Sequence, residues 1–477
     1  MIFNSIDFGI FFPLVFFLYW IFFTKNILHR NIFLISVSYF FYGWWDWRFL
    51  SLIIISSIID FIVGKKIHTQ ENATKRKRWL FISLAVNIGF LGFFKYFNFF
   101  IDSFIEAFSV FGTDLDGYHL NIILPVGISF YTFQTLSYTL DIYYKKLKPT
   151  NNVFAFLAFV SFFPQLVAGP IERAKNLLPQ FLKINTISYD LLRSGLLLMV
   201  WGFFKKIVIA DRLAIFVDNA YLNIDSLDGI TSIVTTIFFT FQLYLDFSAY
   251  SDIAIGSARI LGFNLSTNFR RPFLSSSFSD FWKRWHISLS SWFKDYVYIP
   301  LGGNRVTKTK FIRNILIVFI LSGLWHGASW NFVIWGALNG LFILVFDKLL
   351  SNKNNTLFKK LFTSCFIFSL WALSLIFFRA QTFSDAINMF YNLFKANNDV
   401  LFNYGLNSKE FSFTIRLILV YIGFEIIIEN SSNIYQWFIS RSFIIRWAAY
   451  ISILIIILLY GSYGVGLNDN NFIYFQF

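Results

Sequence analysis

The chain has one cysteine in 477 residues, so a disulfide framework and a cysteine metal site are both excluded. That residue, Cys365, lies within an apolar run and is expected to be a small buried hydrophobic side chain. The sequence also lacks a Gly-x-Ser-x-Gly elbow and a Walker-type phosphate loop. Neither a serine hydrolase built on such an elbow nor an enzyme with that nucleotide loop is therefore indicated.

Charged residues are scarce at 14%, whereas 57% of residues are hydrophobic and 22% are aromatic. Many apolar runs reach the ~18 to 25 residues that a membrane-spanning helix needs, and they are continuous rather than alternating, which disfavours strands. The net charge of +14 would suggest a nucleic-acid partner in a soluble protein. Here Lys and Arg collect in short loops between apolar runs, as the positive-inside rule requires, so we expect a lipid bilayer and no nucleic acid.

We expect an all-α polytopic membrane protein with about 11 transmembrane helices, plus re-entrant and interfacial helices, in a single domain over residues 1–477. The first apolar run lacks a basic leader and a cleavage site, so it is interpreted as a retained helix. Residues 380–394 have an amphipathic pattern that is typical of a helix on the membrane surface. The candidate spans are Phe8–Phe23, Asn31–Trp45, Phe49–Val63, Trp79–Phe100, Asn121–Tyr143, Phe154–Val167, Gly195–Val217, Thr231–Phe263, Phe311–Phe346, Leu361–Phe378, Phe413–Ile428 and Phe443–Tyr460.

The charged loops predict an orientation. The basic run Lys75–Arg78 marks a cytoplasmic loop, and the acidic stretch Asp102–Asp116 follows on the other side, which places the N-terminus outside. By the same count, residues 219–228 lie outside and the loop at 300–305 lies inside. The long stretch Phe311–Phe346 is flanked by basic residues at both ends, so it is predicted to fold back near its middle, at His326.

Two of the five histidines need an explanation. Three of them lie in polar, turn-like segments, whereas His286 and His326 lie among apolar and tryptophan-rich sequence. An ionisable side chain costs free energy at membrane depth and is therefore a candidate functional group. A neutral imidazole in a dry site can accept a proton from a hydroxyl. The alternative for His326 is a histidine that only bonds a neighbouring helix. The alternative for the charges near His286 is an ordinary cytoplasmic basic surface.

A basic entrance to this site is also predicted. The loop Pro300–Arg305 contains a Gly pair whose backbone can approach phosphates, although as a bare pattern the signal is weak. Two histidines forty residues apart make a poor metal set, and no metal is expected. The residues predicted to surround an anionic donor are Lys283, Arg284, Lys294, Asn304 and Arg305, and those predicted to line the cavity are Gln134, Trp285, Trp325 and Trp330.

Six sequence blocks occur in a fixed order across nearly the whole chain. They are Pro125–Gln134, Phe163–Arg173, Tyr244–Asp252, Arg284–His286, Pro300–Arg305 and Leu324–Trp330. These blocks resemble those of the membrane-bound O-acyltransferases. The resemblance is strongest to the bacterial branch that contains the alginate O-acetylation protein and the peptidoglycan O-acetyltransferases, which share the opening Phe3-Asn4-Ser5.

The resemblance implies a funnel through the bilayer with His326 as the family's invariant active-site histidine and His286 as the second histidine of the bacterial branch. It also implies acyl transfer from a cytoplasmic thioester, either acetyl-coenzyme A or an acyl carrier protein, with no bound cofactor. An extracytoplasmic SGNH-type transferase or esterase would complete O-acetylation of an envelope polysaccharide such as alginate or peptidoglycan. The expected location is the bacterial cytoplasmic membrane.

Other functions remain open at this stage. D-alanyl transfer to teichoic acid uses the same chemistry with another donor. An intramembrane histidine also suits a proton-coupled transporter, although repeated halves are not visible in the sequence. A scaffold for an envelope complex would leave the two histidines without a purpose.

Overall fold

The computed structural model describes residues 1–109, 112, 119–350, 356–396, 401–431, 434–463 and 472–473, and these residues form helices and loops without a β-strand. Part of the predicted outside loop, including Asp114 and Asp116, lies outside them. In the first half of the chain the helices are α1 (Ile6–Leu18), α2 (Ile27–Asp46), α3 (Leu50–Thr69), α4 (Ala73–Leu91), α5 (Phe97–Ser109), α6 (Ile128–Tyr143), α7 (Val153–Ser161), α8 (Phe163–Leu166), α9 (Ala174–Leu177), α10 (Tyr189–Phe203), α11 (Asp211–Leu222) and α12 (Gly229–Ile260).

The second half begins with two short helices and then returns to long ones. These are α13 (Phe278–Arg284), α14 (Ile287–Phe293), α15 (Lys308–His326), α16 (Trp330–Leu350), α17 (Leu357–Arg379), α18 (Phe383–Asn392), α19 (Ser408–Asn430), α20 (Ile434–Ile439) and α21 (Phe443–Tyr460). Four π-helical turns join or extend the helices, namely η1 (Tyr19–Phe23), η3 (Gly92–Tyr96), η5 (Phe204–Ala210) and η8 (Lys294–Tyr298).

The predicted all-α architecture is confirmed, and each predicted span contains helix. Within the described residues, eight helical stretches are long and apolar enough to cross a membrane, so the expected number of about 11 is not confirmed. Two reasons account for the difference. The predicted spans Asn31–Trp45 and Phe49–Val63 lie in one continuous helical stretch, Ile27–Thr69, and other predicted spans are broken or too short. Helix α6 begins only at Ile128, and the predicted span 154–167 is two short helices, α7 and α8.

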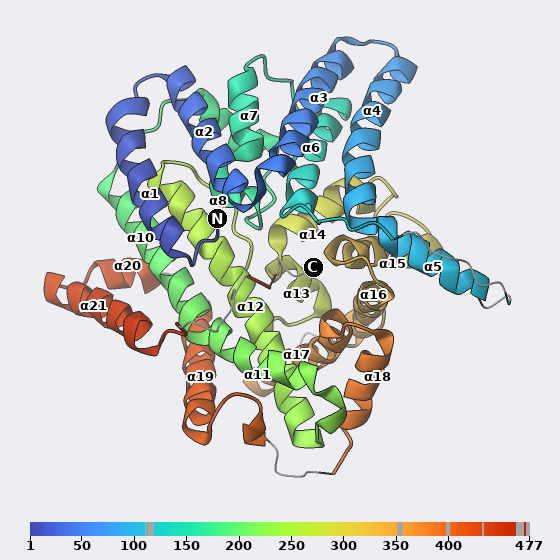
Figure 1. Cartoon of the computed structure of the whole chain (residues 1–477), viewed down its shortest axis with the longest axis vertical. Helices are drawn as coiled ribbons and strands as arrows, with labels where there is room; N and C mark the ends of the chain where they lie inside the picture. The colour runs from blue at the N-terminus through green and yellow to red at the C-terminus, as the bar shows by residue number, and fades with distance from the viewer. Residues whose placement is uncertain are drawn as a thin grey trace.

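The longest helix, α12, lies at the centre of the molecule beside α10 (Figure 1). It contributes to both hydrophobic clusters, with Phe247 and Tyr250 in one and Phe238 and Tyr244 in the other. The two helices approach closely because glycines face the contact: a Cβ at Gly195 would press on the backbone of α12. Small residues give membrane helices this close approach, so α10 and α12 form the central pair around which the others pack.

The predicted fold-back is confirmed. Helix α15 ends at His326, and α16 starts four residues later and packs against it. Two glycines make this hairpin possible, because a Cβ at Gly323 would overlap the carbonyl oxygen of Phe332 and one at Gly336 would overlap that of Phe319. The chain therefore reverses at His326 with its two arms in backbone contact.

The outer helices expose large apolar side chains, as a lipid-facing surface requires. Helix α21, at the periphery in Figure 1, exposes Ile444, Leu458 and Leu459. The prediction for Cys365 is wrong: its side chain is exposed, because α17 turns that face outward while Ile367 and Trp371 face the core. In a membrane protein, lipid and the protein core are both apolar, so an apolar run does not reveal which face of its helix is buried.

The amphipathic segment predicted at 380–394 contains α18, whose N-terminus has a capping box between Thr382 and Asp385. Its apolar residues divide between two faces. Ala386 and Met389 are buried, whereas Phe383 and Ile387 are exposed. The helix is therefore anchored on one side and presents an apolar strip on the other.

The α15–α16 hairpin gives a stability prediction. We expect Gly323→Ala to destabilise the protein by ~1 to 3 kcal/mol, the usual effect of overpacking, because the added methyl meets backbone rather than a flexible side chain. The control is Gly89→Ala on α4, where a Cβ meets no atom within 4 Å and alanine favours the helix. The measurement is the unfolding temperature in detergent micelles. Equal unfolding temperatures for the two variants would contradict the close contact.

Candidate active site

His326 is the last residue of α15 and is only 4% exposed. Aromatic rings surround its imidazole: the ring centroid of Trp335 on α16 lies 5.1 Å away, and that of Phe378 on α17 lies 5.4 Å away. Trp325, the preceding residue, lies edge-on at 4.9 Å. These rings exclude water from most of the imidazole, as a desolvated proton acceptor requires.

His286 lies between α13 and α14 in a left-handed conformation, with φ 43° and ψ 54°. This conformation is uncommon for residues other than glycine and indicates a backbone held by its surroundings. The buried residue Asn268 holds this turn through both its backbone and its side chain. Its carbonyl accepts the Ile287 N–H at 2.9 Å, and its side-chain oxygen accepts the Ser288 hydroxyl at 2.9 Å. The sharp turn aims His286 inward, where it is 1% exposed.

The two imidazoles share one site. Their ring centroids are 6.2 Å apart, and Trp325 lies beside both, at 5.6 Å from His286. Phe247 of α12 packs edge-on against His286 at 4.7 Å. The structure thus brings together two histidines that lie forty residues apart in the sequence, close enough for both to reach one small group.

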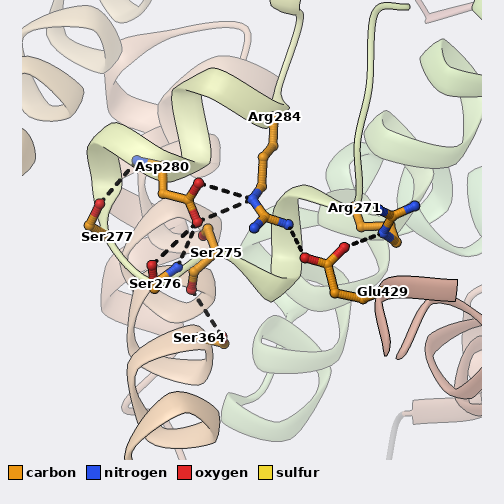
Figure 2. Close-up of polar contacts among 8 residues, drawn as sticks. All are labelled: Arg271, Ser275, Ser276, Ser277, Asp280, Arg284, Ser364 and Glu429. Carbon is orange, nitrogen blue, oxygen red and sulfur yellow. Dashed lines mark hydrogen bonds and ion pairs between the residues drawn. The ribbon is translucent and has the colours of Figure 1, made fainter. Parts of the chain in front are cut away.

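An ion-pair network supports the His286 turn from outside (Figure 2). Arg284 donates from Nε to both carboxylate oxygens of Asp280 at 3.1 Å and from a terminal nitrogen to Glu429 of α19 at 2.8 Å. Glu429 also accepts from Arg271, itself in a left-handed conformation. Arg284 therefore ties α13 to α19, and its guanidinium is engaged by two carboxylates rather than directed at a donor.

Two of the predicted donor-binding residues, Lys283 and Lys294, line one cavity of about 390 Å³. The same cavity contacts Ile287, which follows His286, and Ser322, which lies one helical turn before His326 on the same face of α15. Trp282 also lines it and contacts Trp335, the ring beside His326. This basic cavity therefore extends from exposed lysines toward the two histidines.

A second, smaller cavity reaches His326 directly. It measures about 70 Å³ and is lined by Lys95, by Leu124–Gly127 and the first turn of α6, by Val167, and by Trp325 and His326. A volume of this order holds a few water-sized groups. His326 thus contributes to the small cavity, while Ser322 of the same helix lines the basic one.

The loop at 300–305 is present as predicted but does not line either cavity. Gly302 and Gly303 have positive φ, and Asn314 of α15 donates to the carbonyls of Leu301 and Gly303 at 3.1 Å. Asn304 and Arg305 are exposed at its tip.

The remaining predicted cavity residues are dispersed. Gln134 is buried in α6 and donates to the carbonyl of Phe159 at 2.6 Å, and Trp285 packs in the core against Trp371. Trp330 is half exposed and lines a large apolar groove, which Trp325 also borders. Of this group, only Trp325 contacts both histidines. Among the described residues, no group of three His, Cys, Asp or Glu side chains could hold a metal ion.

The sequence reasoning missed Lys95. Its ammonium donates to the carbonyls of Trp325 at 2.7 Å and His326 at 2.9 Å, and the neighbouring Tyr96 hydroxyl donates to Leu324 at 2.6 Å. The signal was present, because a lysine between Phe94 and Tyr96 interrupts an otherwise apolar span. The same signal marks Lys205 and Lys206, whose ammonium groups bind Asp252 and Asp246 of α12.

Comparison with known proteins identifies the family. The sequence model of the family described as "MBOAT, membrane-bound O-acyltransferase family" matches residues 143–382. The peptidoglycan O-acetyltransferase of Helicobacter pylori is 35% identical over 460 residues, which cover 87% of this chain and 86% of the relative. The chain belongs to the membrane-bound O-acyltransferase family. The resemblance drawn from the sequence blocks is therefore confirmed.

Other relatives of this membrane-bound O-acyltransferase are also named as enzymes that transfer acyl groups. The probable alginate O-acetylase AlgI of Azotobacter vinelandii is 38% identical over 83% of this chain and 78% of its own length. The teichoic acid D-alanyltransferase of Bacillus subtilis is 31% identical over 48% of this chain and 60% of its own length. Family membership makes the chain an O-acyltransferase, and its apolar helices make it a multi-pass membrane protein.

The left-handed turn at His286 gives a prediction. We expect His286→Asn to fold at least as well as His286→Ala, because asparagine tolerates this conformation better than alanine does. Both variants should lose acyl transfer by a factor of ~10 to 100, the range for a residue that orients rather than reacts. Acyl transfer is measured at equal membrane abundance, with the exposed His68→Asn as control. A complete loss in His286→Asn would instead give His286 a direct chemical role.

Proposed function

We propose that this O-acyltransferase moves an acetyl group from a cytoplasmic thioester to a hydroxyl, for O-acetylation of a cell-envelope polysaccharide. The observation that carries the proposal is the pair of buried imidazoles, 6.2 Å apart, between a basic cavity and a small cavity on His326. The printed names of its relatives, a peptidoglycan O-acetyltransferase and an alginate O-acetylase, favour acetyl as the acyl group and a polysaccharide as the acceptor.

The donor enters through the basic cavity in this proposal. A volume of about 390 Å³ is within the range of small-molecule sites, and Lys283 and Lys294 at its exposed side attract a phosphorylated donor. Acetyl-coenzyme A carries such phosphates, and an acidic acyl carrier protein would dock on the same charges. The thioester then extends past Trp282 toward the histidines.

His326 is the proposed general base. It accepts the proton of the attacking hydroxyl as the new carbon–oxygen bond forms, and it returns the proton to the thiolate as the carbon–sulfur bond breaks. The aromatic rings around it keep water away, which limits hydrolysis of the thioester. His286, which lies 5.6 Å from Trp325 and 6.2 Å from His326, orients the reacting groups.

The wider setting follows from the same proposal. The basic loops favour a donor cavity on the cytoplasmic side of a bacterial cytoplasmic membrane. The acceptor side is then outside, where an SGNH-type partner would receive the acetyl group and pass it to the polysaccharide. Residues 1–477 would act as one domain, since partly buried Phe203, Phe269 and Val318 pack against both hydrophobic clusters.

The first test concerns the base. We expect His326→Ala and His326→Gln to abolish acetylation, because neither side chain can accept the proton, whereas the exposed His29→Ala should retain it. The measurement is ester-linked acetyl in the envelope of a deletion strain complemented at equal membrane abundance. D-alanyl esters released by the same alkaline treatment test the alternative favoured by the Bacillus subtilis relative. Normal acetylation in either His326 variant would refute the catalytic assignment.

The second test concerns the donor. We expect Lys283→Gln/Lys294→Gln to raise the donor KM by about tenfold and to change kcat little, because uniform binding energy appears in KM. Lys77→Gln/Lys175→Gln removes the same charge from exposed positions that do not line this cavity and should match the wild type. The assay uses labelled acetyl-coenzyme A or acetylated carrier protein with inside-out membrane vesicles. Use of donor only by right-side-out vesicles would contradict the orientation.

A further inference from the structure

Lys95 is a charged residue in the middle of a long, mainly apolar helical stretch. It belongs to the π-helical turn η3, which joins α4 and α5 in the continuous helical stretch Ala73–Ser109. Single π-helical turns are often found at functional sites. Among the residues that the structure describes, no carboxylate forms an ion pair with Lys95. A salt bridge therefore does not explain why a lysine occupies this position.

Part of the reason is the end of α15. The last carbonyls of a helix have no partner within the helix and carry partial negative charge. Lys95 donates to two of them, those of Trp325 and His326, and Tyr96 donates to the third, that of Leu324. These two side chains satisfy the carbonyl end of α15.

Capping alone does not require a lysine. The Tyr96 hydroxyl satisfies its carbonyl at 2.6 Å without any charge, and a charge at membrane depth is far more costly than a hydroxyl. An ammonium has three donor hydrogens, and two of them serve the carbonyls of α15. One remains, and Lys95 lines the 70 Å³ cavity together with His326, Ser129 and the backbone at Gly127.

We propose that Lys95 is a further catalytic residue that stabilises the oxyanion formed on the acyl carbonyl in this cavity. The inference rests on the proposed role of His326 as base. As the acceptor oxygen bonds to the thioester carbon, its proton passes to His326 and the carbonyl π electrons move onto oxygen. The Lys95 ammonium pairs with that oxyanion. The oxyanion then reforms the carbonyl, the carbon–sulfur bond breaks, and the thiolate takes the proton from His326.

The ligand class follows from this assignment. The small cavity accepts an acyl carbonyl with a short chain, since a volume of about 70 Å³ has room for an acetyl group and little more. A fixed cation in a dry site is already oriented when charge develops on the carbonyl oxygen, which is the condition for strong transition-state stabilisation.

The test compares Lys95→Met with Tyr96→Phe, which removes the neighbouring cap and leaves the cation in place. We expect Lys95→Met to lower kcat by ~10² to 10³, the usual effect of losing an oxyanion donor, with an unchanged donor KM. Tyr96→Phe should keep kcat within about threefold, and Lys95→Arg should recover part of the lost kcat because it keeps the charge. Thiol release from acetyl-coenzyme A and from acetylated carrier protein is followed in membranes that contain the native acceptor and partner.

Unfolding temperatures in detergent separate catalysis from structure. If Lys95→Met unfolds at a lower temperature than Tyr96→Phe, Lys95→Gln takes its place, since its amide can still donate to a carbonyl but carries no charge. Equal kcat in the neutral Lys95 variant and in Tyr96→Phe would overturn the inference. His326→Gln is assayed in parallel: turnover there refutes the proposed role of His326 as base, whereas an inactive His326→Gln beside an active Lys95→Met refutes only the role of Lys95.

Discussion

The need to satisfy backbone polar groups at a buried helix end governs this site. A helix that stops among apolar side chains leaves its last carbonyls without a partner unless other residues supply a hydrogen bond. Helix α15 nevertheless stops at His326, and the fold compensates with the Lys95 and Tyr96 side chains on the carbonyl end and with a tight glycine contact to α16. Because η3 and α16 meet at the end of α15, three separate parts of the chain form the surroundings of His326.

Much of the fold was predictable because it depends on local pattern. Continuous apolar runs predicted the helices, and equal basic flanks around Phe311–Phe346 predicted the reversal at His326. The importance of His286 and His326 was also predictable, because a histidine in tryptophan-rich apolar sequence is conspicuous. That the two rings meet was not predictable from spacing, since it results from how α13, α14 and α15 pack around Trp325.

Two features were not predictable from one sequence: which residues form ion pairs with each other, and which face of each apolar helix is turned toward the core. Arg284 was expected at a donor entrance but binds Asp280 and Glu429, the latter 145 residues away. Cys365 was expected inside but faces outward, because either face of an apolar helix suits lipid equally well. The predicted span at 154–167 is instead two short helices, α7 and α8, which are not among the eight membrane-length helices of the described residues. A chain can break in this way at membrane depth where protein rather than lipid surrounds it.

The buried charges of the central pair have a consequence for how the chain enters the membrane. Lys205 and Lys206 of η5 bind Asp252 and Asp246 of α12 at 2.8 and 2.6 Å. Lys206 also binds Asp211 at the start of α11 at 2.8 Å. Without α12, Lys205 would lack its carboxylate partner, and α12 alone would carry two unpaired aspartates, at ~2.5 to 3.5 kcal/mol for each charged residue at the centre of a membrane helix. Inserted together, they neutralise each other. Because only 40 to 47 residues separate the partners, α10 to α12 form a short stretch of chain whose buried charges are best inserted into the membrane together.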